Sequence, residues 1–387
     1  MRRNHLLFTG AFIMNLNLTM LGLALVYFLA DKFGQEAGMI GLFFALGYGT
    51  YFFGCTLYHR WDESIRPAGS LISAASLIAL LSLGLYFAPR FSLALGALLI
   101  LQGSLGFFWP PLMGWVSAGL EGKELGRNLG QFNQSWSTGA LLGPFAAGWL
   151  YPVNPALPFA VSAVSLVFIS LLFFLGSRLL PDMNPACTLK ARKETPAGLD
   201  RSTPLRFPSW VGIFSSYAVY GVVVNILPLE IRDHLGYGEQ AAGNLLLLRG
   251  IVTLTGFTLL ARHTGWHFSR FWILTVQGVT TVLILTVLIL DSRLEILGAV
   301  ILLFGLLYAA SYNNSIFHGS SGAVNRGRRM AIHEAVLTMG VASGSLGGGF
   351  LYQWGGINLV WLFLLLVQAA GLLAMGLLMM KKTEVSV

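Results

Sequence analysis

The sequence contains little charge and almost no cysteine. Charged residues make up 10% of the 387 residues, and there are two cysteines. Hydrophobic residues make up 55%, and the mean hydropathy is +0.71. A soluble globular protein has about 25% charged residues, because its surface must face water. The composition therefore excludes an ordinary soluble domain and favours a chain whose surface faces lipid.

Several functional signals are also missing. No Gly-rich loop ends in Gly-Lys-Ser or Gly-Lys-Thr, so ATP hydrolysis by this chain is not indicated. His333 and Glu334 are not followed by the second histidine of a zinc-protease motif. Cys55 and Cys187 lie far apart in segments expected on the cytoplasmic side, so no disulfide is expected. The first apolar run continues to Leu29 without a small-residue cleavage site, which indicates an uncleaved membrane span.

The basic residues indicate the orientation in the membrane. The net charge is +8, but Lys and Arg are dispersed among loops, so no nucleic-acid partner is expected. With both termini inside, all but five basic residues lie on the cytoplasmic side. The exceptions are Lys32, Arg90, Arg232 and Arg293 outside, and Arg249 within a span. We therefore expect a multi-pass protein of the cell membrane with both termini in the cytoplasm.

The apolar runs predict an all-α membrane protein with twelve transmembrane helices in two pseudo-symmetric six-helix bundles. One crossing needs about 20 apolar residues. The predicted spans are residues 6–29, 38–58, 68–87, 91–116, 129–150, 157–179, 210–229, 241–261, 271–290, 294–317, 331–352 and 358–380. We expect a break at Pro110-Pro111 in the fourth span. The proposed domains are an N-terminal bundle (1–180), a polar cytoplasmic linker (181–208) and a C-terminal bundle (209–387).

The two halves repeat each other at an offset of about 201 to 202 residues. Half of the matching residues are glycines, which allow close helix approach. They include Gly41 and Gly243, Gly54 and Gly256, Arg60 and Arg262, Gly139 and Gly340, Gly143 and Gly344, Gly148 and Gly349, and Tyr151 and Tyr352. Two parallel repeats of six spans indicate a transporter built around a central site.

In this architecture the sequence resembles the major facilitator superfamily. The segment Gly139–Gly148, with Pro144 inside it, resembles the family's Gly-Pro motif, which is often associated with exporters. The loop Gly54–Asp62 resembles the family's cytoplasmic loop motif and retains Arg60, but it has His59 where the family usually has Asp. The resemblance implies transport by alternating access between the halves and a role for this loop in gating.

Ionisable residues inside the membrane are the first candidates for function, because each costs about 3 kcal/mol by insertion scales. Arg249 stands in the middle of the eighth span with no Asp or Glu at matching depth, which favours an anionic substrate group. The alternative is a structural arginine that donates to helix-end carbonyls. His333 and Glu334 open the eleventh span and are candidates for proton coupling. Alternatively, they form an ordinary helix start at the membrane interface.

Uncharged polar residues on the spans are further candidates to contact a substrate, although each could instead make a helix–helix hydrogen bond. They are Asn17, Gln102, Gln134, Tyr217, Tyr220, Asn225, Tyr308, Asn313 and Asn314. A second group is expected to act in conformational change and packing. Its members are Gly54, Arg60, Gly139, Gly143, Pro144, Gly148, Gly340 and Gly344.

These features predict a secondary active transporter, a symporter or antiporter that moves a small organic solute by alternating access. Arg249 favours an anionic solute, and Glu334 favours coupling to a proton. The alternatives are a multidrug-type exporter of hydrophobic or amphipathic compounds, a membrane-embedded enzyme, and a transport-dead receptor. We expect no catalytic activity, cofactor or metal. The expected partners are the substrate, the coupling ion and the bilayer, with the monomer as the functional unit.

Overall fold

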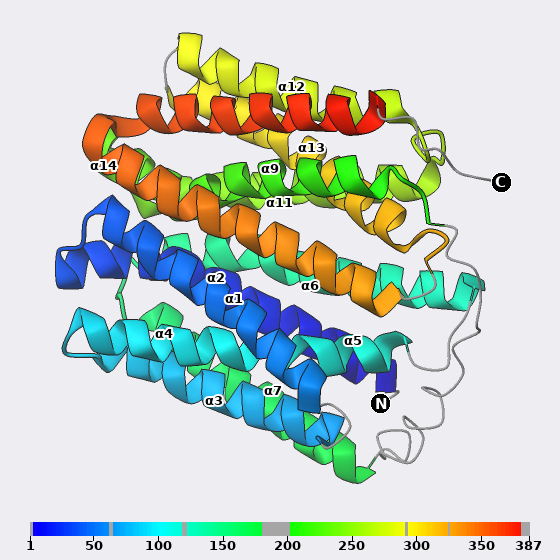
Figure 1. Cartoon of the computed structure of the whole chain (residues 1–387). Helices are drawn as coiled ribbons and strands as arrows, with labels where there is room; N and C mark the ends of the chain where they lie inside the picture. Colours follow the sequence, from blue (N-terminus) through cyan, green and yellow to red (C-terminus); the bar gives the residue numbers. More distant parts are fainter. Residues whose placement is uncertain are drawn as a thin grey trace. The chain divides into compact units, whose positions relative to one another are not determined.

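The computed structural model of the chain describes residues 3–61, 65–117, 122–179, 202–290, 293–323 and 326–380. Within these ranges the chain is helical and has no strand (Figure 1). The helices are α1 (Arg3–Phe33), α2 (Ala37–Trp61), α3 (Pro67–Phe87), α4 (Phe91–Leu105), α5 (Trp109–Ser117), α6 (Gly122–Leu150), α7 (Leu157–Leu179), α9 (Arg206–Asn225), α10 (Leu227–Leu229), the π-helix η2 (Glu230–His234), α11 (Gly238–Arg262), α12 (Arg270–Leu290), α13 (Leu294–Ser320) and α14 (Arg326–Met380). The predicted class, an all-α membrane protein, is confirmed.

Within the part of the chain that it describes, the structure identifies ten candidate membrane spans, whereas the sequence predicts twelve. Ten helices in the described ranges are long and apolar enough to cross a membrane. One of them, α14, includes both of the last two predicted spans, and its backbone leaves the helical region at Gly355 and Gly356. Gly356 has a φ of 70°, which glycine adopts without strain. The fifth predicted span lies in α6, which is not among the ten. The count of twelve therefore stays a prediction.

The fourth span is interrupted, but the predicted position of the break at Pro110-Pro111 is wrong. The helix α4 ends at Leu105, and α5 begins at Trp109, so the turn occupies residues 106–108. Pro110 and Pro111 lie in the first turn of α5 rather than at the break. Proline is favoured there, because the first backbone N–H groups of a helix have no partner within the helix. The double proline therefore starts a helix instead of ending one.

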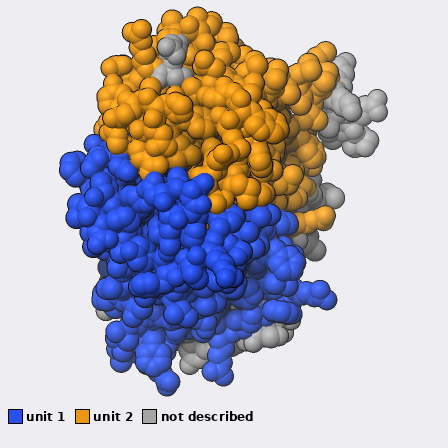
Figure 2. Space-filling model, turned by 90° about the vertical axis from the view of Figure 1, so that its left-hand side faces the viewer, with its two compact units in different colours: residues 1–34, 46–195, 239–247 blue, residues 35–45, 196–238, 248–387 orange. Residues whose placement is uncertain are grey.

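The described chain divides into two compact units (Figure 2). Unit 1 contains residues 1–34, 46–195 and 239–247, and unit 2 contains residues 35–45, 196–238 and 248–387. Two helices are divided between the units. Residues 37–45 of α2 belong to unit 2 and the rest of α2 to unit 1, whereas residues 239–247 of α11 belong to unit 1 and the rest of α11 to unit 2. Cys187 and residues 181–201 of the predicted linker lie outside the described residues. The division into halves around 181–208 stays a prediction.

In unit 1, α6 packs along α1 through its glycines. A Cβ atom added at Gly139 would lie 2.8 Å from the backbone nitrogen of Leu16, and one added at Gly143 would lie 2.7 Å from that of Met20. Such distances are shorter than any real Cβ contact, so no side chain fits at either position. The two backbones can approach only because these positions are glycine.

Unit 2 repeats this packing with the matched glycines. A Cβ at Gly340 would lie 2.9 Å from the Cβ of Tyr217, and one at Gly344 would lie 2.7 Å from the carbonyl carbon of Ala218. Both contacts are with α9, which runs beside α14 in Figure 1. The sequence repeat is therefore a repeat of packing: the fifth span of each half lies against the first span of that half.

A second pair of matched glycine crossings confirms the repeat. In unit 1, a Cβ at Gly148 would lie 3.0 Å from the Cα of Gly243. In unit 2, a Cβ at Gly349 would lie 3.2 Å from the Cα of Gly41. The crossings join α6 to the start of α11 and α14 to the start of α2. Both crossings therefore involve a helix that is divided between the units: residues 239–247 of α11 belong to unit 1, and residues 37–45 of α2 belong to unit 2.

Candidate functional site

Arg249 lies inside a box of aromatic rings in unit 2. Its guanidinium carbon is 4.6 Å from the ring centre of Tyr220, 4.8 Å from that of Tyr308 and 5.9 Å from that of Phe304. Three helices supply these residues, since Arg249 is on α11, Tyr220 on α9, and Phe304 and Tyr308 on α13. An aromatic face attracts a cation through its quadrupole, and the attraction grows when water is excluded.

The tyrosines of the box form one connected cluster with Tyr217. The Tyr308 hydroxyl donates a hydrogen bond of 2.6 Å to the Tyr217 hydroxyl. The ring centres of Tyr217, Tyr220 and Tyr308 lie between 5.1 and 5.6 Å apart. Residues three apart, such as Tyr217 and Tyr220, and four apart, such as Phe304 and Tyr308, share one helix face. The local helical period therefore brings Phe304 and Tyr308 to Arg249 from one face of α13, and Tyr217 packs beside Tyr220 on one face of α9.

A close helix approach positions the arginine. A Cβ at Gly305 would lie 2.8 Å from the backbone oxygen of Arg249, so α11 and α13 approach closely at this level. The hydroxyl of Thr253 donates to the carbonyls of both Arg249 and Gly305 at 3.0 Å. This hydroxyl therefore links the backbones of α11 and α13 one helical turn after Arg249.

The charge of Arg249 is not neutralised within the described part of the chain. Only 7% of the residue is exposed, and its buried Nε–H has no hydrogen-bond partner. No described carboxylate forms an ion pair with it. A guanidinium cannot shed its proton to escape burial, and a buried donor without an acceptor is costly. The ring faces offset part of that cost, and a bound anion would satisfy the remaining donors.

A second polar group lies farther along α13. The Nδ1 atom of His333 is 2.7 Å from the Ser315 hydroxyl, and Tyr312 packs its ring edge-on against the imidazole at 5.2 Å. His333 is 1% exposed, and its Nε2 has no hydrogen-bond partner. Glu334 is half-buried and lies within electrostatic range of the Tyr308 and Tyr312 hydroxyls. The proton-coupling candidates are therefore close to the tyrosine cluster.

Three of the predicted amides on the second half differ in their surroundings. Asn314 is 3% exposed, and its side-chain oxygen has no hydrogen-bond partner, so it has an acceptor available. Asn313 is half-buried on the neighbouring position of α13. Asn225 instead donates to the Ser345 hydroxyl at 2.7 Å and ties α9 to α14. Its geometry is that of a packing residue, and we leave it out of the proposed site.

The predicted polar residues of the first half belong to unit 1. Asn17 is fully buried, donates to the Ile13 carbonyl at 2.7 Å and accepts from Ser165 at 2.9 Å, so it links α1 to α7. Gln102 is half-buried on α4, and Gln134 is exposed on α6. Their roles in substrate binding stay predictions.

The remaining predicted residues concern packing and gating. Gly54 lies against α4, where its added Cβ would be 2.9 Å from the carbonyl carbon of Gly103. Arg60 is exposed near the end of α2, and Asp62 lies outside the described residues. Pro144 lies inside α6, and its carbonyl oxygen would be 2.8 Å from a Cβ at Gly243. These positions pack helices, and their role in gating stays a prediction.

Sequence reasoning brought Arg249, Tyr217, Tyr220 and Tyr308 into one list, and the structure brings them into one cluster. The sequence-based prediction did not include Phe304 and Tyr312, which flank Tyr308 at intervals of four residues. That spacing places all three rings along one face of α13. Aromatic residues at intervals of four along α13 are the signal for this stripe, and it is not visible when polar residues are read singly.

Comparison with known proteins agrees with this architecture. The family model of the Major Facilitator Superfamily matches residues 7–324. The chain belongs to this superfamily, and it is a multi-pass transport protein. The resemblance deduced from the spans and the Gly-Pro segment is thereby confirmed.

The relatives and the solved structures match most of the length of this chain. Multidrug resistance protein MdtH of Shigella boydii is 26% identical over 89% of this chain and 86% of its own length, and MdtH of Escherichia coli shows the same identity and coverage. A POT family transporter in complex with a thioalcohol-conjugated peptide has a TM-score of 0.78 at 11% identity, covering 98% of this chain and 96% of its own. The nucleoside transporter NupG has a TM-score of 0.73 at 12% identity, covering 99% and 100%. At such identities the two structures show the fold alone.

Proposed function

We propose that the protein is a secondary transporter that carries a small organic anion by alternating access and binds it at Arg249. The observation that supports the proposal is the buried guanidinium, which has an unpaired Nε–H and no described carboxylate partner. A carboxylate, sulfonate or phosphate can receive two parallel hydrogen bonds from such a group. The surrounding tyrosines favour a substrate whose anionic group is attached to a flat apolar body.

The proposal includes coupling to a proton through Glu334, with His333 beside it. Glu334 lies within electrostatic range of Tyr308 and Tyr312, and His333 packs against Tyr312. Tyr308 is on the same helix as Tyr312 and contacts Arg249. Protonation of Glu334 would change the charge next to the anion site, so proton binding and anion binding would be linked. The tyrosine cluster provides the short path for that electrostatic coupling.

Export of amphipathic compounds is the second candidate function. Relatives named as multidrug resistance proteins match most of the chain, and the Gly-Pro segment of α6 resembles the exporter motif. Under this candidate the aromatic box would bind flat apolar molecules of any charge. The two candidates therefore differ in whether binding requires a negative group.

A matched ligand panel distinguishes the two candidates. We expect 2-naphthoate to raise the melting temperature of the purified protein, and 2-naphthalenemethanol and 2-naphthylmethylammonium to have little effect. A ligand that binds only the folded state raises its melting temperature by mass action. Similar stabilisation by all three compounds would favour the second candidate. Stabilisation by the ammonium compound alone would contradict the anion site.

The proposed orientation places both termini and the segment 181–208 in the cytoplasm. A cytoplasmic reporter such as green fluorescent protein fused after Met380 should then be fluorescent, and alkaline phosphatase at the same site should be inactive. The reason is the excess of Lys and Arg in the loops that this orientation places inside. The matched control is the same pair of reporters inserted after Asp291, in a loop expected outside. Active phosphatase after Met380 would reverse the orientation.

A further inference from the structure

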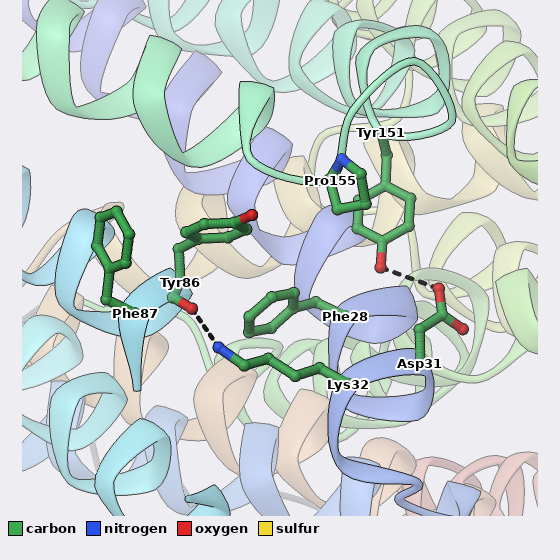
Figure 3. A pocket seen from close by; sticks show the side chains of 7 residues that line it. All are labelled: Phe28, Asp31, Lys32, Tyr86, Phe87, Tyr151 and Pro155. Carbon is green, nitrogen blue, oxygen red and sulfur yellow. Dashed lines mark hydrogen bonds between the residues drawn. The ribbon is translucent and has the colours of Figure 1, made fainter. Parts of the chain in front are cut away.

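A pocket of about 370 Å³ lies in unit 1, and Arg249 is not among the residues that line it (Figure 3). Its volume is within the range of about 300 to 1,000 Å³ that is typical of small-molecule sites. The residues that line it are Phe28, Asp31, Lys32, Tyr86, Phe87, Tyr151 and Pro155. Its walls are therefore aromatic and apolar, and it contains one cation and one anion.

The ends of the predicted spans place the pocket at the depth of lipid head groups. Phe28 to Lys32 belong to the last turns of α1, and Tyr86 and Phe87 end α3. Tyr151 and Pro155 belong to the connection between α6 and α7. These are the ends of predicted spans, where the hydrocarbon core gives way to the head-group region. Phe87 is 71% exposed at this level, as expected for an aromatic ring at the membrane interface.

One side of the pocket presents the Lys32 ammonium. The ammonium donates to the Tyr86 carbonyl and lies 4.9 Å from the ring centre of Phe28, 5.4 Å from that of Phe33 and 5.5 Å from that of Tyr86. An ammonium has three N–H donors, so this contact leaves two for a ligand. The rings and the carbonyl hold the charge in place, and the side chain remains exposed.

The other side presents the Asp31 carboxylate. The Tyr151 hydroxyl donates to it at 2.9 Å. A carboxylate has about four lone-pair positions, so it can also accept from a ligand ammonium. In Figure 3 the ring of Phe28 lies between the Lys32 contact and the Asp31 contact. A ligand with a negative and a positive group would therefore meet the opposite charge at each side.

The fold itself does not require this combination. The second half repeats the tyrosine–carboxylate bond, because Tyr352 donates to Glu230 at 2.8 Å. However, α12, the counterpart of α3, ends in Val287, Leu288, Ile289 and Leu290, without an aromatic residue. A tyrosine–carboxylate bond thus suffices to join the helices in the second half. The aromatic walls that surround Lys32 are therefore an addition in the first half.

We propose that this pocket binds the head group of a zwitterionic phospholipid. The phosphate accepts from Lys32, and the ethanolamine ammonium donates to Asp31 and lies against the aromatic walls. The lipid is favoured over a soluble solute because the pocket is at head-group depth, where such head groups are the surrounding solvent. The site is independent of substrate binding at Arg249.

The test measures the melting temperature of the whole protein in detergent micelles with added phosphatidylethanolamine, phosphatidylglycerol or soluble glycerophosphoethanolamine. We expect phosphatidylethanolamine to give the largest increase. Lys32→Gln should weaken its apparent affinity by about tenfold, because a charge-assisted hydrogen bond is lost. Asp31→Asn should remove the preference for phosphatidylethanolamine over phosphatidylglycerol, which has no ammonium. The control Arg90→Gln alters an exposed cation that precedes α4 and does not line the pocket, and it should change nothing.

Each other outcome overturns part of the proposal. Equal stabilisation by soluble glycerophosphoethanolamine would make the ligand a solute instead of a lipid. An unchanged lipid response in Lys32→Gln would remove the site altogether. Because the readout is the increase caused by lipid, a lower starting stability of a variant does not hide the result. If Lys32→Gln does not fold, Lys32→Arg, which retains the charge, should fold and keep the response.

Discussion

The variant Gly143→Leu should not accumulate as a stable folded protein. An added Cβ at this position overlaps the Leu16 carbonyl oxygen and the Thr19 hydroxyl and lies 2.7 Å from the Met20 nitrogen. Two of these three atoms belong to the backbone of α1, so they cannot move aside as a side chain would. Overpacking typically costs about 1 to 3 kcal/mol, and a backbone collision is at the upper end. The measurement is the yield of monodisperse protein together with its melting temperature.

The matched control is Gly84→Leu. Gly84 is also inside a transmembrane helix, but it is exposed, and nothing lies within 4 Å of an added Cβ. The variant should express and melt like the parent. The repeat further predicts that Gly344→Leu behaves like Gly143→Leu, because its added Cβ would lie 2.7 Å from the Ala218 carbonyl carbon. Equal yields of Gly143→Leu and Gly84→Leu would show that the close contact between α1 and α6 is not essential.

Arg249→Lys and Arg249→Ala should fold but lose most transport and most ligand-induced stabilisation. Arg249 donates no side-chain hydrogen bond to another described residue, so its removal leaves no acceptor unpaired. Lysine keeps the charge but cannot offer the planar fork that binds an anion through two hydrogen bonds and stacks on Tyr220 and Tyr308. We expect apparent affinity for the stabilising anion to fall at least about tenfold in both variants. Naphthoate titrations followed by thermal unfolding measure it.

The control for this series is Arg293→Lys, in the same unit. Arg293 is exposed and precedes α13, so the exchange should affect neither folding nor binding. Parental affinity in Arg249→Lys or Arg249→Ala would make Arg249 a structural residue that packs against three rings. A large fall in melting temperature without ligand, with the ligand increment intact, would lead to the same conclusion.

The sequence by itself determined the membrane class, the approximate spans and the internal repeat. These follow from local properties: run length against bilayer thickness, and glycines at a constant offset. The predicted span 157–179 coincides with α7, and the predicted span 271–290 begins one residue after the start of α12. The sequence also singled out Arg249, because a charge in an apolar run is visible without a structure.

Only the tertiary structure decided what surrounds each polar residue. Asn225 and Asn314 look alike in sequence, yet the first donates to Ser345 and the second has an unpaired oxygen. Lys32 appears in the sequence as one more basic residue at a span end, but the fold places three rings around its ammonium. The period of one helix fixes which face a residue occupies. Which neighbour meets that face depends on long-range packing between helices, and no local pattern in the sequence encodes it.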